Sequence, residues 1–339
     1  MIHFIVFFLS ENLKISLIRE VFMSTSMNFE LFKESVIQIV KEKLGEEYRV
    51  LADDVIKNNG IVLTGIIIQE PDNNTSPTIY INSFYEDYLR GVSIMKITDA
   101  ICEVFSQNRH IRSVDMSHFT NYEEARKQIA YKLVHYDKNR KLLESIPHRQ
   151  FYNLAVVFYY IAMEEPFFGK ASIMITNAHL RHWNIDEQTL YRDAEVNTPN
   201  ILPAQIENIE EVMLGLLKKQ VKDEKHAEDL WEQIHAKIKG ESDTIPMYVL
   251  SNTSRCQGAA CMLYPEVLKN FANKIKKDLF ILPSSIHEVI ILPAMPDMKE
   301  EELLSMVTEI NATQVEESEV LADSIYCYFR EKDSLEYLC

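Results

Sequence analysis

The residues with the clearest chemical potential lie together in the segment Pro283–Glu288, which contains Ser284, Ser285, His287 and Glu288. Serine, histidine and a carboxylate are the side chains of a nucleophilic triad. On a strand, Ser285 and His287 share one face while Glu288 points to the other, so the histidine and this glutamate cannot meet. No G-x-S-x-G turn is present. The segment indicates either a nucleophilic site or a turn whose hydroxyls hydrogen-bond the local backbone.

The histidines do not follow a known metal-binding pattern. His287-Glu288 matches the start of H-E-x-x-H, but Ile291 stands in place of the second histidine and the segment predicts a strand rather than a helix. His179 and His182 are three residues apart, a spacing that a helix could turn to one side. No clustered carboxylate or cysteine completes a shell. These two histidines indicate a binding site or a partly exposed strand–helix junction, and we predict no metal.

The segment Pro77–Tyr88 mixes aromatic and polar side chains, among them Tyr80, Asn82 and Tyr85. Such side chains suit a binding cleft because they lose water easily and still form hydrogen bonds. They suit equally well a strand leading into a helix that packs on a sheet. We keep both interpretations, and take these three residues as candidate binding residues.

The five cysteines are scattered and odd in number: Cys102, Cys256, Cys261, Cys327 and Cys339. This pattern is not a disulfide framework and suits a reducing cytoplasm. Cys256 and Cys261 form the only close pair, and without a nearby histidine they are predicted to be small core residues rather than metal ligands.

Glycine is scarce, with 8 residues in a chain of 339. Loops that bind phosphate need several glycines so that backbone N–H groups can approach the anion. The one Gly-Lys pair, Gly169-Lys170, is followed by Ala171 rather than serine or threonine. The sequence therefore does not favour a standard nucleotide-binding loop, and no cofactor is predicted.

The formal net charge is −16, from 51 acidic and 35 basic residues. This acidic surplus disfavours binding to nucleic acid and to anionic membranes, because proteins that bind them need Lys and Arg side chains. A protein partner remains compatible with the charge, as does a surface that serves solubility alone. Residues 1–26 contain a short apolar run without a preceding basic residue, and we interpret them as an extension or weakly ordered tail, with a targeting segment as the alternative.

Patterns along the chain predict an α+β fold with mainly antiparallel sheets, built from strand-strand-helix units with helices packed on one face. Asn58-Asn59-Gly60 predicts a hairpin with a type I′ turn. Helices are expected at 121–133, 204–221 and 225–238, and a strand at 258–263. The expected domains are residues 27–110, 111–203 and 241–339, each α+β, with 204–240 as a helical connector.

Several segments resemble the family called domain of unknown function 5688. They include PTIYINSFY at Pro77–Tyr85, ITNAHLRHW at Ile175–Trp183, GAACMLYP at Gly258–Pro265 and FILPSSIHEVIILP at Phe280–Pro293. The resemblance spans about residues 28 to 330, and the middle and C-terminal parts are also distantly similar to domain of unknown function 1444. It implies a bacterial, cytoplasmic protein and carries no reaction to any residue.

Three functions remain compatible with the sequence. The leading hypothesis is a non-enzymatic protein-binding or regulatory module, because no catalytic signature is present and aromatic strands could form an interface. The second is a hydrolase-like enzyme without a standard motif, with Ser284, Ser285, His287, His179 and Tyr85 as first residues to test. The third is a mobile-element protein associated with nucleic acid, which would need a hidden basic face. The oligomeric state is not predicted.

Overall fold

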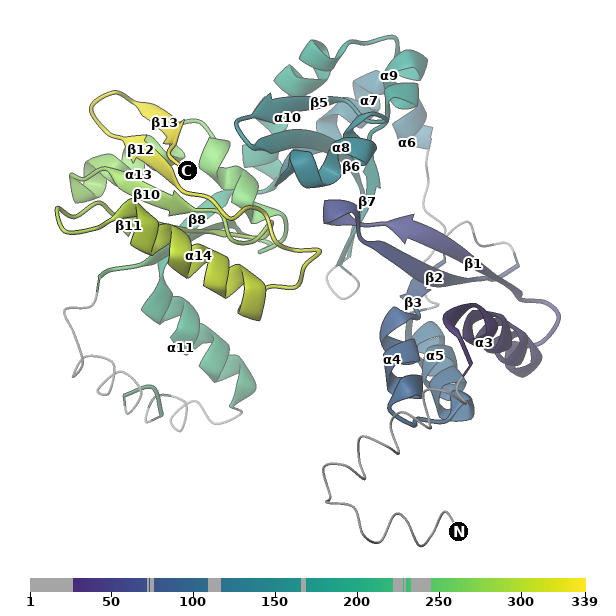
Figure 1. The fold of residues 1–339 in the computed structure, drawn as a ribbon. Helices are drawn as coiled ribbons and strands as arrows, with labels where there is room; N and C mark the ends of the chain where they lie inside the picture. Colours follow the sequence, from purple (N-terminus) through teal and green to yellow (C-terminus); the bar gives the residue numbers. More distant parts are fainter. Residues whose placement is uncertain are drawn as a thin grey trace, which may run out of the picture. The chain divides into compact units, whose positions relative to one another are not determined.

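The computed structural model describes residues 27–71, 73, 76–108, 117–165, 169–221, 228, 230–232 and 245–339 (Figure 1). The expected tail at 1–26 and most of the expected helix at 225–238 lie outside these residues. The chain divides into two compact units. The first contains Met1–Lys57, Val62–Asp115 and Glu165–Gly169, and the second contains Asn58–Ile61, Met116–Glu164 and Lys170–Cys339.

The described residues of the first unit form a three-stranded antiparallel sheet packed with three helices. Its elements are α3 (Phe29–Leu44), β1 (Arg49–Ile56), β2 (Val62–Gln69), β3 (Thr78–Tyr80), α4 (Asn82–Leu89) and α5 (Ile94–Asn108), with sheet order β1-β2-β3. Asn28 caps α3 by accepting a hydrogen bond from Leu31 N at 2.9 Å. Phe32, Ile66 and Ile101, from a helix, a strand and a second helix, are fully buried in one core.

The predicted hairpin is confirmed by the antiparallel pairing of β1 with β2, from Arg49↔Gln69 to Ile56↔Val62. The turn is longer than the type I′ turn we expected. A 3-10 turn, η1 (Asn58–Gly60), replaces it, with Asn59 at φ 62° and Gly60 at φ 73°. Both residues still supply the positive φ angles that such a sequence favours.

The second unit contains two antiparallel sheets that share one large core. A four-stranded sheet has the order β4-β6-β5 with β7 paired to β6, and a six-stranded sheet has the order β13-β12-β10-β11-β9-β8. The strands are β4 (Ile129–His135), β5 (His148–Phe151), β6 (Leu154–Glu165), β7 (Gly169–Met174), β8 (Ala204–Asn208), β9 (Tyr248–Asn252), β10 (Leu279–Leu282), β11 (Val289–Pro293), β12 (Tyr326–Phe329) and β13 (Ser334–Tyr337). The α+β class with antiparallel sheets is confirmed.

The helical segments of the second unit cover the sheets and connect their strands. They are α6 (Ser117–Thr120), α7 (Tyr122–Ala125), η2 (Arg126–Gln128), η3 (Asp137–Asn139), α8 (Arg140–Leu143), α9 (Asn177–Trp183), α10 (Glu187–Ile201), α11 (Ile209–Gln220), η4 (Gly258–Leu263), α13 (Val267–Ile275) and α14 (Glu300–Gln314). Leu303 and Val307 of α14 pack on Leu292, and Figure 1 shows this helix lying along β11. Phe271 of α13 joins the larger core, which also contains Ile281.

Three expected elements differ from the structure. The expected strand at 258–263 is the 3-10 helix η4, whose residues are nearly all buried, and an apolar run without periodicity does not separate the two conformations. The expected helix at 121–133 ends at Ala125, is followed by η2, and from Ile129 becomes β4 because these residues pair along β6. The expected helix at 204–221 begins instead at Ile209, because residues 204–208 form β8 beside β9.

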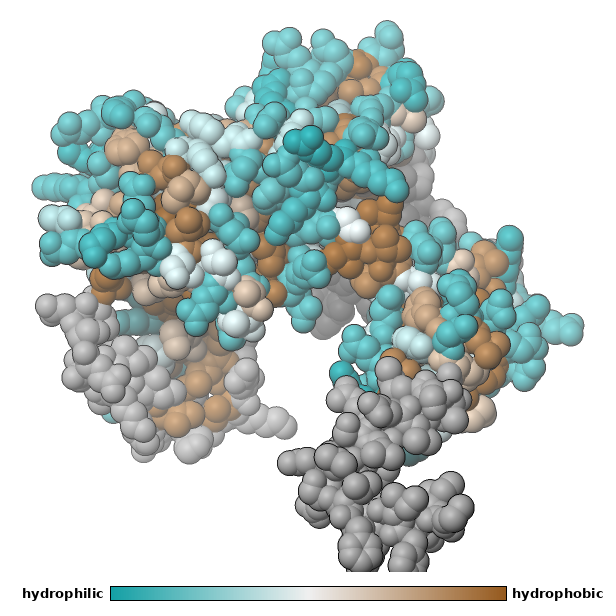
Figure 2. All heavy atoms as spheres, viewed as in Figure 1, coloured by the Kyte–Doolittle hydropathy of each residue, from teal (hydrophilic) through white to brown (hydrophobic). Residues whose placement is uncertain are grey.

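No helix among the described residues is both long enough and apolar enough to cross a lipid bilayer. On the face drawn in Figure 2 hydrophilic residues dominate, and apolar residues gather over α11. Met213 and Leu216 of this helix are exposed.

Candidate functional site

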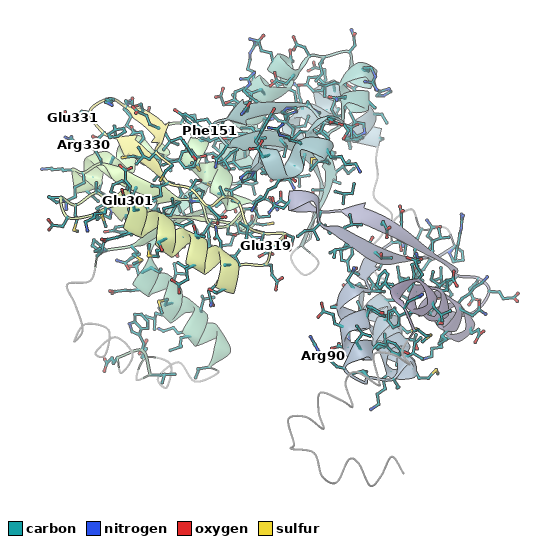
Figure 3. All side chains as sticks on the ribbon, viewed as in Figure 1. Arg90, Phe151, Glu301, Glu319, Arg330 and Glu331 are labelled. Atoms are coloured by element: carbon teal, nitrogen blue, oxygen red, sulfur yellow. The ribbon has the colours of Figure 1, made fainter. Side chains whose placement is uncertain are left out.

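Three side chains from distant segments meet at His287. The ring of His287 lies with Nε2 at 3.4 Å from Oε1 of Glu319 and is also a hydrogen-bond partner of the Cys256 side chain. Cys256 is exposed, and Glu319 lies in the loop after α14, where Figure 3 labels it. We call Cys256, His287 and Glu319 the thiol cluster.

The strand–turn–helix segment around Cys256 places the thiol at the surface. β9 ends at Asn252, Cys256 lies in the turn, and η4 begins at Gly258. Arg255 and Gln257, on either side of the cysteine, have φ angles of 50° and 56°. Side chains other than glycine rarely adopt these angles, and strained turns of this kind concentrate at functional sites.

Asn252 fixes this turn from inside. Its Oδ1 accepts hydrogen bonds from the backbone N of Ser254 at 3.0 Å and of Cys256 at 3.4 Å, and its Nδ2 donates to the carbonyl of Cys256 at 2.8 Å. The residue is fully buried. A buried amide that makes this many bonds to one turn specifies its conformation strongly, since each lost bond would leave a buried polar group unpaired.

Backbone contacts hold the other two segments beside the turn. Ile286 N donates to the carbonyl of Glu319 at 2.8 Å, and Ala259 N donates to the carbonyl of Ile286 at 3.2 Å. Ser251 Oγ donates to the carbonyl of His287 at 2.8 Å. The thiol cluster therefore rests on a hydrogen-bonded frame rather than on side-chain contacts alone.

The ring of His287 is oriented from both sides. Gln257 N donates to Nδ1 at 3.3 Å, which leaves Nε2 toward the carboxylate of Glu319. The hydrogen bond with Cys256 and the negative charge of Glu319 raise the pKa of His287 above its ordinary value, against the opposing effect of partial burial. A cysteine in contact with a histidine that also faces a carboxylate is the arrangement in which a thiol can become a nucleophile.

The other four cysteines lie in different surroundings. Cys261 and Cys327 are buried, and loss of water raises the pKa of each thiol to about 12. Burial also raises the pKa of Cys102 and Cys339. The prediction that the close pair are core residues is right for Cys261 and wrong for Cys256. Nothing in the local sequence pairs Cys256 with His287, because β10 and α13 separate them along the chain.

The two serines proposed from sequence lie beside His287 and make hydrogen bonds with the backbone. Ser285 Oγ accepts a hydrogen bond from His287 N at 3.1 Å, so this hydroxyl supports the local turn. Ser284 contributes its backbone, whose carbonyl accepts from Leu321 N at 3.0 Å. The carboxylate partner of His287 is Glu319 rather than the neighbouring Glu288, and sequence reasoning missed it because the contact crosses from a different loop.

His179 and His182 lie on α9. His179 Nδ1 accepts a hydrogen bond from Thr176 N at 3.1 Å, and its ring packs edge-on against Phe119 at 5.0 Å. Burial lowers the pKa of His179, and the charge of exposed His182 lowers it further. Within the described residues no group of three or more His, Cys, Asp and Glu side chains is arranged to hold a metal ion. His179 therefore acts in this structure as a cap for its helix.

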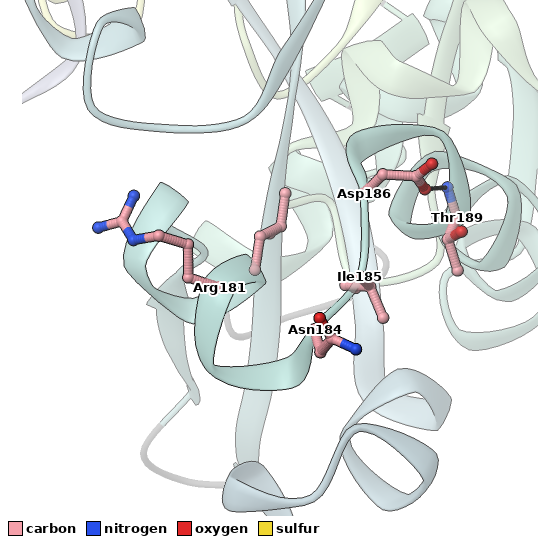
Figure 4. Close-up of a pocket in the computed structure, with 6 residues that line it drawn as sticks. Arg181, Asn184, Ile185, Asp186 and Thr189 are labelled. Atoms are coloured by element: carbon pink, nitrogen blue, oxygen red, sulfur yellow. Dashed lines mark hydrogen bonds between the residues drawn. The ribbon is translucent and has the colours of Figure 1, made fainter.

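A surface hollow of about 630 Å³ lies between the end of α9 and the start of α10 (Figure 4). Arg181, Asn184 and Thr189 contribute to its lining. Asp186 is its acidic side chain, and Oδ1 accepts from Thr189 N at 2.8 Å, the bond drawn in the figure. This carboxylate caps α10, so the hollow brings no free reactive pair together.

Tyr80, Asn82 and Tyr85 have internal partners in the first unit. Lys57 Nζ lies 4.1 Å from the ring centre of Tyr80, and Asn82 Oδ1 accepts from Thr64 N at 2.9 Å. Tyr85 donates to the carbonyl of Met27 at 3.1 Å. These contacts hold the strand–helix junction together, and they favour the packing interpretation of this segment.

Comparison with known proteins identifies the family of this chain but assigns no activity to it. A search of curated proteins and a search of solved structures each found no match. A family model described as "Family of unknown function (DUF5688)" matches residues 29–330, as the segments of the sequence led us to expect. The chain therefore belongs to this family of unknown function, DUF5688.

Proposed function

We propose that this protein is a thiol-dependent hydrolase of acyl compounds, with Cys256 as nucleophile, His287 as general base and acid, and Glu319 as the residue that positions the imidazole. One observation carries the proposal: His287 is a hydrogen-bond partner of an exposed thiol and at the same time faces a carboxylate. A nucleophile, a base and an orienting group in contact are the minimum for nucleophilic catalysis.

The reaction would follow the usual two stages of acyl transfer. The Cys256 thiolate attacks the carbonyl carbon of an ester or amide, and the tetrahedral intermediate collapses to a thioester. The leaving alcohol or amine departs with the proton that His287 donates. Water, deprotonated by His287, then attacks the thioester carbonyl, which releases the carboxylic acid and returns the thiol.

The hypothesis of a non-enzymatic protein-binding module receives less support. It rested on the lack of a catalytic signature in the sequence and on the aromatic segment around Tyr80 and Tyr85, whose polar groups are engaged inside the first unit. The hypothesis of a nucleic-acid partner still conflicts with a formal charge of −16. A bacterial, cytoplasmic location stays part of our proposal, since a working thiol needs a reducing compartment.

The test is acylation of the whole protein by p-nitrophenyl acetate. We expect rapid release of nitrophenol, with one acetyl group found on the peptide that contains Cys256. His287→Ala should slow acylation about 100-fold or more, because the thiol loses its base. Cys256→Ser should abolish it. Peptide mass spectrometry and the absorbance of nitrophenol measure both quantities.

Glu319→Gln distinguishes positioning from simple folding. This change removes the charge that helps to raise the pKa of His287, so the midpoint of the pH–rate profile should shift to lower pH. Ser284→Ala is the matched control, in the same loop region but outside the cluster, and should leave the rate unchanged. Acetyl groups distributed over all five cysteines, or an unchanged rate in His287→Ala, would overturn the proposal.

A further inference from the structure

A second site lies in the same unit, between the start of α8, the turn from β5 to β6 and strand β13. It is a cleft of about 350 Å³, lined by Tyr136, Tyr152 and Tyr337 with Asp137, Arg140 and Gln150 around them. We call it the tyrosine cleft. None of the residues of the thiol cluster contributes to its lining.

Two of the tyrosines are exposed to solvent. Tyr152 is 46% and Tyr337 39% exposed, while the other aromatic side chains of the described residues are less exposed. Their rings stack on each other with centres 5.8 Å apart and planes at 23°. An exposed aromatic pair beside a cleft is typical of a binding surface, because flat rings give up water readily on contact.

Local contacts hold this pair of rings in place. Tyr152 has a φ of 52°, a conformation that costs energy for a large side chain, and Gln150 Nε2 donates to its carbonyl at 2.9 Å. Its ring also packs against Phe151 at 4.9 Å, the residue labelled in Figure 3, and against Tyr326 at 6.0 Å. Tyr326 in turn hydrogen-bonds Asn153. A strained turn supported on several sides is preorganised for contact.

The charges of the tyrosine cleft cancel. Arg140 Nη2 lies 2.7 Å from Asp137 Oδ1, and Arg140 Nε donates to the same oxygen at 2.8 Å. A charged ligand would have to break this pair, whereas a neutral one can hydrogen-bond its outer atoms. The amides of Gln150 and Asn153 add both donors and acceptors at the rim.

We propose that the tyrosine cleft binds a neutral saccharide. A pyranose ring has a C–H face that packs on tyrosine and a rim of hydroxyls that can each donate and accept hydrogen bonds. The exposed tyrosines match the first property, and the Asp137–Arg140 pair with the amides matches the second. The volume of the cleft lies at the lower end of the range for small-ligand sites, which suits one ring rather than a long segment.

The test is titration of the whole protein with maltohexaose, cellohexaose and the hexamer of N-acetylglucosamine, followed by saturation-transfer NMR and calorimetry. We expect saturable binding of at least one of these. Tyr152→Ala should weaken it about tenfold, and Tyr152→Trp should retain it because stacking is preserved. Arg140→Ala, an exposed change that folding tolerates, should weaken it severalfold through lost hydrogen bonds.

Val196→Ala, at an exposed position of α10, is the matched control and should leave binding unchanged. Cys256→Ser should also leave it unchanged, so this result stands whether or not the thiol cluster is catalytic. Absence of saturable binding by all three oligosaccharides would overturn the proposal. Equal binding by the wild type, Tyr152→Ala and Arg140→Ala would do the same, since contact would then lie elsewhere.

Discussion

At the scale of single residues, the five cysteines experience very different surroundings. Cys256 is exposed and contacts the ring of His287, while Cys261 and Cys327 are buried, with thiol pKa values raised to about 12. The thiolate, not the thiol, reacts with electrophiles. The chain therefore contains one thiol arranged for reaction among several that packing protects.

Limited alkylation with iodoacetamide should modify Cys256 first, and His287→Gln should slow this modification. The pKa of His287 is raised above its ordinary value of 6.5, so the imidazolium that stabilises the thiolate persists to higher pH than in a free histidine. The ratio of wild-type to variant rates should be largest below that raised pKa. The ratio should fall toward one as the pH rises through the raised pKa, because His287 then becomes neutral in the wild type as well. Peptide mass spectrometry at several pH values measures the ratio.

Cys102, which is half-buried and has a raised pKa, is the internal control for this experiment. Its slower alkylation should be the same in both proteins. A ratio that stays constant from pH 5 to pH 9 would contradict the contact between imidazole and thiolate. The same ratio at Cys102 and Cys256 would indicate general unfolding of the variant instead.

At the scale of elements, Gly258 allows the turn of Cys256 to approach the segment of His287. A Cβ atom at this position would lie 2.5 Å from the carbonyl oxygen of His287 and 2.7 Å from the backbone N of Asn252. Both are backbone atoms within hydrogen-bonded segments, so moving either one would disrupt these hydrogen bonds. The start of η4 therefore requires glycine for close approach rather than for an unusual φ angle.

Gly258→Ala should destabilise the second unit by about 3 kcal/mol, the upper part of the range for overpacking. It should also slow acylation of Cys256, because the clash displaces His287. Urea unfolding measures the first effect and nitrophenol release the second. Gly215→Ala is the control: nothing lies within 4 Å of a Cβ at this position of α11, so it should stabilise the helix by about 1 kcal/mol. Equal effects of the two changes would refute the close-packing argument.

Local patterns predicted the elements whose boundaries depend on their own residues. Asn28 and Asp186 cap their own helices, and Asn58-Asn59-Gly60 reverses the chain between β1 and β2, though by a 3-10 turn rather than the expected type I′ turn. Local sequence patterns predicted the wrong element where pairing with a distant strand decides the conformation. Residues 204–208 become a strand because β9 lies beside them, which no local signal reveals.

The candidate site shows the same division between local and distant information. His287 was identifiable from the Ser-His-Glu segment, and its neighbour Ser285 does contact it through the backbone. Cys256 and Glu319 were not identifiable, because the antiparallel order β10-β11-β9 and the loop after α14 bring them to the histidine. Spacing along the chain carries information about a site only when one element supplies all its residues.

At the scale of the whole molecule, the surplus of negative charge opposes compactness. Like charges repel one another in this chain, whose formal charge is −16, and the repulsion acts over about 30 Å at 0.01 M salt but only about 8 Å at 0.15 M. Salt also weakens favourable ion pairs. Many of these are exposed pairs between residues three or four apart in the sequence, such as Arg90–Glu86 and Lys127–Glu124, and each contributes at most about 1 kcal/mol.

Repulsion should therefore outweigh the pairs, and the midpoint of thermal unfolding should rise when NaCl increases from 0.01 M to 0.15 M. A gain of about 1 kcal/mol corresponds to a rise of roughly 2–4 °C in a unit of this size. Scanning calorimetry measures the midpoint, and glycerol at equal osmolality is the control, because it does not screen charge. A midpoint that falls with salt would mean that the ion pairs stabilise the chain more than its acidic surplus destabilises it. The surplus would then need a role outside folding, as a surface for a cationic partner.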